Sequence, residues 1–325
     1  MPPTNVSPGY KISKFLANTI TQETSIFAFI SNKINIFLLL MLSNSIFPIT
    51  ANHLVRSLDN LSQLTGNYKF LNPLKFIYSS RAINAIWLYW AEARSPYLTN
   101  FLIKYGSPTK NCEQPSLFVS SRLLLTKTKE LESSKPEIFK IIVNAVTDSN
   151  TLISENALFL TQKNLNQRSY NIICDIWYQT RNAKLLALLM ENQYLPTGNG
   201  IAQAALLLLK DNFEICLQKS LQFVPFLIAL LQDQNSEITE RADFCLRNLT
   251  DQESIDIFFK IWSKTRTNRL STIITECRYN ATQPLEIHVL TSLRQNELSR
   301  FYNFPPETLP FLIAGLTDKD KLIHS

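Results

Sequence analysis

The stretch from Pro225 to Leu249 reads PFLIALLQDQNSEITERADFCLRNL and decides the fold. Its first half carries apolar residues at helical spacing: Phe226, Leu227, Leu230 and Leu231. Its second half carries another such stripe: Ile238, Ala242, Cys245, Leu246 and Leu249. Between them, Asp233, Asn235 and Ser236 are typical of turns and helix N-caps. The stretch therefore predicts two short amphipathic helices joined by a turn.

A helix pair with this pattern resembles a HEAT repeat. Ala242 lies on the apolar stripe, where a small side chain lets two helices approach closely. The HEAT pattern usually has an arginine directly after the position of Ile238, whereas this chain has Thr239. The resemblance is to the HEAT-repeat proteins of bacteria, and it implies an all-α, armadillo-like α-solenoid.

An internal repeat extends this interpretation to most of the chain. Trp90, Trp177 and Trp262 lie 87 and 85 residues apart. Each begins the motif Trp-x-x-x-Arg, which ends at Arg94, Arg181 and Arg266, respectively. Few gaps are needed to align the three copies, so we expect an α-solenoid with a super-repeat of about 85 residues.

Aspartate and alanine recur with the same period. Asp148 and Asp233 each precede the next tryptophan of the repeat by 29 residues, and Ala157 and Ala242 follow those aspartates by nine. The segment FLIALLQD, which ends at Asp233, matches FLIAGLTD, which ends at Asp318. These positions complete the predicted repeat signature.

The repeat divides the chain into an N-terminal extension, residues 1–50, and a solenoid, residues 51–325. The solenoid units are expected at 79–165, 166–250 and 251–325, the last one incomplete, as in a fragment of a longer array. Leu54 to Asp59 is interpreted as a degenerate first copy of the helix pair, broken by Gly66 and Pro73. The apolar run in residues 34–49 is predicted to be a buried helix at the end of the solenoid; a signal sequence or membrane anchor is the alternative.

Capping residues predict the helix boundaries. Ser79, Asn166 and Asp251 stand eleven residues before the repeat tryptophans, and Ser95, Asn182 and Thr267 directly follow the repeat arginines. All six are residue types that favour the N-cap. One helix should therefore end near each arginine and another begin there. A further helix is expected at 201–210, with a counterpart at 287–294.

Two roles are open for the Trp-x-x-x-Arg motif. Residues at i and i+4 share a helix face, so the guanidinium can lie over the indole. In one interpretation, the tryptophan fills the core and the arginine caps its helix. In the other, the motifs form a stripe of pockets for an acidic partner. The packing interpretation is favoured because the motif recurs once in each unit.

The sequence predicts no catalytic, cofactor-binding or metal-binding residue. The three histidines stand at 53, 288 and 324 without a zinc motif, and the five cysteines, at 112, 174, 216, 245 and 277, form no Cys-x-x-Cys. An odd number of widely spaced cysteines on apolar faces is typical of buried, reduced thiols in a cytoplasmic protein. Glycine-rich phosphate-binding motifs are also lacking.

Charge gives no sign of a nucleic-acid groove. The net charge is +6, and residues 1–110 hold 10 Lys and Arg against 3 acidic residues. These charges are scattered, so we expect no nucleic-acid partner, and contact with a membrane through residues 34–49 is not favoured.

The function predicted from these observations is a non-catalytic scaffold that binds another protein. Two alternatives stay open. The helix modules are also similar to those of phycobilin lyases, HEAT proteins that attach tetrapyrroles to cysteines of client proteins. The chain can equally be the regulatory arm of a larger multidomain protein.

Overall fold

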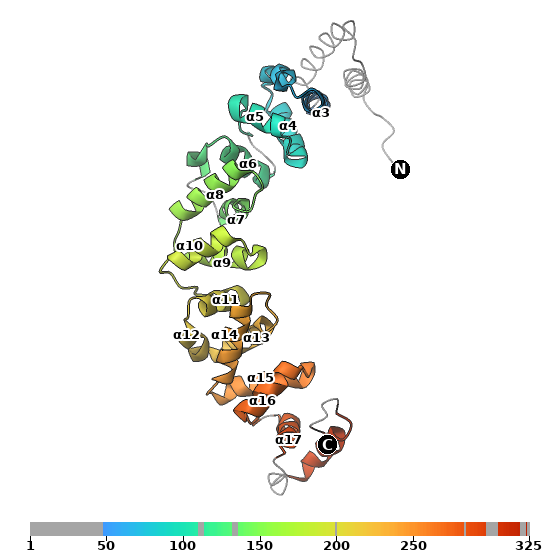
Figure 1. The fold of residues 1–325 in the computed structure, drawn as a ribbon, viewed down its shortest axis with the longest axis vertical. Coiled ribbons are helices and arrows are strands. Elements are labelled where there is room, and N and C mark those ends of the chain that lie inside the picture. Colours follow the sequence, from blue (N-terminus) through green and yellow to red (C-terminus); the bar gives the residue numbers. More distant parts are fainter. Residues whose placement is uncertain are drawn as a thin grey trace. The chain divides into compact units, whose positions relative to one another are not determined.

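The computed structural model describes residues 48–109, 114–131, 136–198, 200–282, 284–296, 305–318 and 323. Across these residues all regular structure is helical, so the chain is all-α (Figure 1). It forms two compact units, Met1–Leu165 and Asn166–Ser325. The apolar run at 34–47 lies outside the described residues, and its predicted role stays a prediction. None of the helices in the described part of the chain is long and apolar enough to cross a membrane.

The first unit contains eight described helical elements. In chain order these are α3 (Pro48–Thr65), the 3-10 helix η1 (Tyr68–Phe76), α4 (Ser80–Ala93), α5 (Pro96–Tyr105), α6 (Pro115–Leu124), the 3-10 helix η2 (Thr128–Leu131), α7 (Pro136–Ala145) and α8 (Thr151–Lys163). Helix α3 packs on η1 and α4, and α6 packs on α4, α7 and α8. Trp87 and Trp90 of α4 are fully buried, so this helix supplies the largest side chains of the core.

Helix α3 corrects the prediction of a helix pair around Asp59. It runs without a break from Pro48 to Thr65, and Asp59 lies inside it rather than in a turn. The turns at Asp148 and Asp233 each have an asparagine two residues beyond the aspartate, whereas Leu61 occupies that place here. Without an N-capping side chain, nothing competes with helical hydrogen bonding. The helix ends at Thr65, directly before Gly66. The φ of Gly66 is +68°, a conformation that favours glycine, and this agrees with the predicted break at this residue.

The second unit continues the all-helical pattern. Its elements are α9 (Gln167–Thr180), α10 (Ala183–Glu191), α11 (Ile201–Leu209), α12 (Phe213–Gln218), α13 (Ser220–Leu230), α14 (Ser236–Arg247), α15 (Gln252–Thr265), α16 (Asn268–Cys277), α17 (Leu285–Arg294), the 3-10 helix η4 (Pro306–Thr308) and α18 (Leu309–Gly315).

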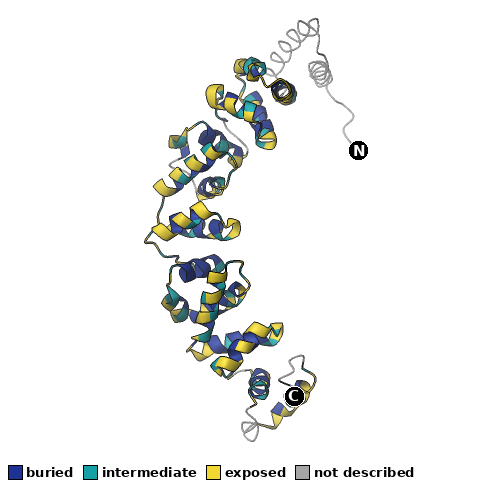
Figure 2. Ribbon diagram, viewed as in Figure 1, coloured by how far each residue is buried: buried dark blue, intermediate teal, exposed yellow. Residues whose placement is uncertain are grey.

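Helix α11 lies at the centre of this unit. Its residues from Ala202 to Leu209 are all buried, and the helix is dark blue in Figure 2. It packs on α9, α12, α13 and α14. A helix that is apolar on every face is expected where neighbours surround it, so α11 forms the core that positions the helices around it.

The helix pair predicted from residues 225–249 is formed by α13 and α14, which pack on each other. Helix α13 begins at Ser220, upstream of Pro225, which therefore lies inside it. Asn235 caps α14, because its side-chain oxygen accepts hydrogen bonds from the backbone N–H groups of Glu237 and Ile238, at 2.9 and 3.4 Å. The predicted turn and N-cap are confirmed.

Candidate functional site

Each repeat tryptophan lies in the last turn of a helix, and each repeat arginine ends that helix. Arg94, Arg181 and Arg266 are the C-caps of α4, α9 and α15 and have left-handed backbone, with φ of 47°, 53° and 49°. Their backbone N–H groups donate to the tryptophan carbonyls at 2.8, 2.6 and 2.8 Å. A residue in this conformation satisfies an orphan carbonyl and turns the chain away from the helix axis. The next helix then begins within two residues, as the capping residues predict.

The arginine side chain folds back over the tryptophan of its own motif. The guanidinium carbon lies 4.4 Å from the Trp90 ring centre in the first copy, 5.6 Å from Trp177 in the second and 4.3 Å from Trp262 in the third. The indoles are at most 2% exposed. This is the stacking that the i, i+4 spacing predicts, and each arginine lies over the ring of a buried tryptophan. In the second copy the guanidinium carbon lies closer still to the neighbouring Tyr178 ring, at 4.0 Å.

Each arginine also forms an ion pair with the repeat aspartate that follows it by 52 to 54 residues. The N–O distances are 3.0 Å for Arg94–Asp148, 2.5 Å for Arg181–Asp233 and 2.8 Å for Arg266–Asp318. The aspartate side chains are only 12%, 1% and 11% exposed. Sequence reasoning found these residues but not their pairing, although the nearly constant separation of arginine and aspartate was the available signal.

We call these sets the Trp–Arg–Asp clusters: Trp90, Arg94 and Asp148; Trp177, Arg181 and Asp233; Trp262, Arg266 and Asp318. In the first two clusters the aspartate has a second role. Its other oxygen accepts the backbone N–H of Asn150 at 2.8 Å or of Asn235 at 2.9 Å. Each of these asparagines then caps the following helix, α8 or α14. The cluster thus ties the end of one helix to the turn of the helix pair.

Ala157 and Ala242 lie on the second helices of these pairs, α8 and α14, and both are fully buried. Helix α8 packs on α7, and α14 packs on α13. Full burial of both residues fits their position on the apolar stripe of the helix pair.

A hydroxyl partner for two of the tryptophans was missed by sequence reasoning. The indole Nε1–H of Trp90 donates to Thr99 Oγ1, and that of Trp262 donates to Ser271 Oγ, both at 2.8 Å. Both hydroxyls lie nine residues after their tryptophan. The corresponding residue after Trp177 is Leu186, which has no hydroxyl. The signal was present in the spacing, but it occurs in only two of the three copies.

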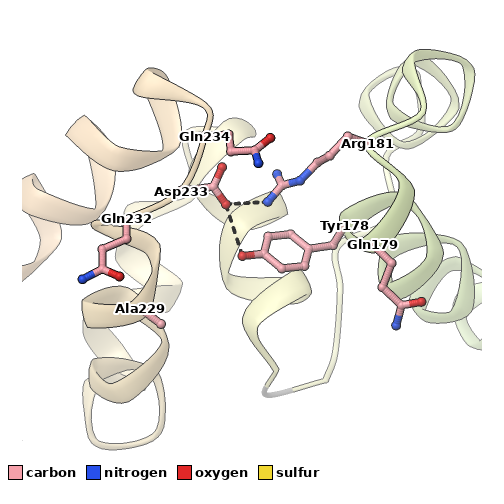
Figure 3. A pocket seen from close by; sticks show the side chains of 7 residues that line it. All are labelled: Tyr178, Gln179, Arg181, Ala229, Gln232, Asp233 and Gln234. Carbon is pink, nitrogen blue, oxygen red and sulfur yellow. Dashed lines mark hydrogen bonds and ion pairs between the residues drawn. The ribbon is translucent and has the colours of Figure 1, made fainter.

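A pocket of about 320 Å³ lies beside the second cluster. Tyr178 and Gln179 of α9 form one wall with Arg181, and Ala229 of α13 lies opposite; the turn residues Gln232, Asp233 and Gln234 complete the lining (Figure 3). The hydroxyl of Tyr178 donates to the same Asp233 oxygen that binds Arg181, at 3.1 Å. We call this hollow the Arg181–Asp233 pocket. Its polar lining makes it a candidate binding site.

The pocket holds no group poised for acid–base work. Burial, together with the Asp233 carboxylate, raises the pKa of Tyr178 above its usual value, so this phenol keeps its proton near neutral pH. Nor do the described residues contain a group of three or more His, Cys, Asp or Glu side chains that could hold a metal ion.

Three of the described cysteines are unsuited to nucleophilic chemistry. Cys174, Cys216 and Cys245 are buried and free. Burial raises the pKa of Cys216 and of Cys245 to about 12, and it raises that of Cys174 further. Because the thiolate is the reactive form, these residues behave as small apolar core residues.

These thiols are expected to resist alkylation in the native protein. At pH 8, iodoacetamide should leave Cys174, Cys216 and Cys245 unmodified, whereas Cys277, which is partly exposed, should react more readily. Peptide mass spectrometry after timed labelling measures each site separately, with the unfolded protein as the fully labelled control. Rapid native labelling of Cys216 would contradict both the burial and the raised pKa.

Comparison with known proteins assigns the chain to no family. Neither a family model nor a curated protein matches the chain. The crystal structure of an engineered protein from the Northeast Structural Genomics Consortium aligns over 99% of this chain and 94% of its own, with 11% identity and a TM-score of 0.25. So low a TM-score carries no argument, and the clusters and the pocket remain the basis for a functional interpretation.

Proposed function

We propose that this chain is a non-catalytic scaffold that binds another protein, built as an α-solenoid of HEAT-like helix pairs with a super-repeat of about 85 residues. Three sets of tryptophan, arginine and aspartate with the same local contacts support the repeat. In such an array each unit buries its faces against its neighbours and leaves helix ends and turns free for recognition.

The observation that carries the binding role is a surface position that differs in each cluster. It lies between the tryptophan and the arginine, two residues from each. Glu92 occupies it in the first cluster, Gln179 in the second and Lys264 in the third, and all three are exposed. The packing residues are therefore the same while the neighbouring surface residue is acidic, neutral or basic. Constant packing with variable surface chemistry is expected of a recognition scaffold, in which partner choice depends on the surface.

The free thiols of Cys174, Cys216 and Cys245 support a reducing compartment, and we propose the cytoplasm. Residues 111–325 hold 22 Lys and Arg against 23 acidic residues. This near-neutral charge supports a protein partner rather than a nucleic acid, because phosphate binding requires a basic surface.

The proposal is tested by capturing a partner with the full chain and measuring the binding of the purified pair by calorimetry. The combined variant Gln179→Ala, Gln232→Ala and Gln234→Ala should weaken binding by about tenfold or more, the effect of losing ~1.4 kcal/mol. The matched control is Gln222→Ala, an exposed glutamine near the other end of α13. A chain that captures no saturable protein partner would refute the scaffold role. Equal binding by the combined variant and the control would refute its assignment to this pocket.

A further inference from the structure

The charges of the Arg181–Asp233 pocket are already matched to each other. Arg181 and Asp233 form an ion pair, and Tyr178 donates a further hydrogen bond to the same carboxylate. The Asp233 side chain is only 1% exposed. An anionic ligand would compete with Asp233 for Arg181, and a cationic ligand would compete with Arg181 for Asp233. Either would leave a half-buried charge without its partner, which is costly. A neutral ligand avoids both costs.

The remaining polar groups of the pocket are primary amides. Gln179, Gln232 and Gln234 are exposed, and each offers two N–H donors and one carbonyl acceptor. Figure 3 shows Gln234 next to the ion pair, with Gln232 and Gln179 on either side. A ligand that presents a donor and an acceptor close together satisfies such groups better than one that offers only a single kind.

The pocket also lies at the ends of two helices. Gln179 and Arg181 lie at the C-terminal end of α9, and Gln232 follows the C-terminal end of α13. Several carbonyls at these ends are already used: Trp177 accepts from Arg181, and the last carbonyls of α13 accept from the backbone N–H groups of the following turn. The glutamine amides are therefore the groups that can offer a ligand both a donor and an acceptor.

The amide lining belongs to the second cluster alone. Where the second cluster has Gln179, Gln232 and Gln234, the first has Glu92, Thr147 and Ser149, and the third has Lys264, Thr317 and Lys319. Since the Arg–Asp ion pair forms in all three clusters with different residues at these positions, it does not require these glutamines. These three glutamines can therefore determine which ligand the pocket binds.

We propose that the Arg181–Asp233 pocket binds the carboxamide side chain of an asparagine or glutamine in an extended segment of the protein partner. This inference rests on the proposed scaffold function. A volume of about 320 Å³ has room for one such side chain and its flanking backbone. A small-molecule site is usually an enclosed, largely apolar cavity, whereas this pocket is lined by exposed polar side chains.

The test is a two-dimensional amide NMR titration of the full chain with four capped peptides. The probes are acetyl-Ala-Xaa-Ala-amide with glutamine, glutamate, lysine or methionine as Xaa, so that the backbone contribution is constant. The glutamine peptide should bind about tenfold more tightly than the other three. Its carboxamide both donates to and accepts from the glutamine amides without bringing a charge, whereas glutamate only accepts, lysine only donates and methionine does neither well. Shifts should be confined to signals of Gln179, Gln232, Gln234 and their neighbours.

Substitution at one position should change this preference. Gln179→Lys should favour the glutamate peptide, and Gln179→Glu should favour the lysine peptide, since the new charge lies at the rim of a pocket that is otherwise neutral. The control Gln222→Glu, on the same unit but outside the pocket, should leave the order of the peptides unchanged. Unfolding midpoints equal to that of the unsubstituted chain show that the variants fold, as expected for exposed positions.

The outcomes separate this inference from the scaffold proposal. If the four peptides bind equally, or if the glutamine peptide binds equally well after Gln179, Gln232 and Gln234 are all replaced by alanine, the carboxamide assignment is overturned. Loss of the captured protein partner in that same combined variant would still support the scaffold. If neither the peptides nor the partner depend on these glutamines, both proposals fail for this pocket.

Discussion

Replacing Trp90 or Trp262 with alanine is expected to lower the free energy of unfolding by about 3–5 kcal/mol, the usual cost of truncating a large buried aromatic residue. Both indoles are 0% exposed. The substitution would leave a cavity. It would also leave the hydroxyl of Thr99 or Ser271 without the indole N–H that donates to it. An arginine whose guanidinium lies over the indole would lose that contact as well.

Phenylalanine substitutions separate the hydrogen bond from the packing. Trp90→Phe and Trp262→Phe should each cost about 1 kcal/mol more than Trp177→Phe, because only the first two leave a hydroxyl without its donor. Leu186 occupies the corresponding place beside Trp177. Urea unfolding followed by circular dichroism gives the stabilities, and hydrogen exchange with mass spectrometry shows which unit has lost protection. Wild-type midpoints for the alanine variants would mean that the indoles are exposed.

The second large effect is expected at Asp233. Asp233→Ala should lower the free energy of unfolding by about 3 kcal/mol, because one buried carboxylate accepts from Arg181, Tyr178 and the backbone N–H of Asn235. Water can reach Arg181 and Tyr178 after the change, which keeps the cost below that of three fully buried bonds. Asp233→Asn should cost less, since its side-chain oxygen still accepts from the turn.

Asp148→Ala is the matched comparison and should be milder than Asp233→Ala. Its carboxylate is 12% exposed, its partner Arg94 is 37% exposed, and Ala91 stands where the second cluster has Tyr178. A double-mutant cycle of Arg181→Ala with Asp233→Ala should give a loss smaller than the sum of the single losses, because the two side chains interact. Strict additivity would show that the ion pair contributes nothing, and equal losses at Asp148 and Asp233 would contradict the importance of burial.

The local features of this fold could be predicted from the sequence because they depend on neighbouring residues. Asn182 caps α10 through hydrogen bonds to backbone N–H groups two and three residues away, so its role is evident from the residues around it. The same holds for Asn235 and for the stacking of Arg94 on Trp90. Where a capping side chain is missing, as after Asp59, the local pattern of apolar residues misled the prediction.

The contacts between distant residues could not be predicted in the same way. Arg181 and Asp233 were both recognised as repeat residues, but their pairing depends on how α9 packs relative to the turn after α13. The glutamines of the pocket were missed for a different reason. A search for repeats selects positions that stay the same, and Gln179, Gln232 and Gln234 change from cluster to cluster. The residues best suited to recognition are therefore the ones that such a search discards.

The ion pairs of the clusters close long loops of the chain without a covalent bond. Each joins two residues more than fifty positions apart, a span that secreted proteins often close with a disulfide bond. A disulfide acts largely by restricting the unfolded chain, whereas an ion pair exists only once the chain has folded. The ion pairs therefore do not stabilise the fold by lowering the entropy of the unfolded chain. They also cannot form covalent bonds between the wrong residues, and a reductant does not break them. Closure by arginine and aspartate is independent of redox conditions.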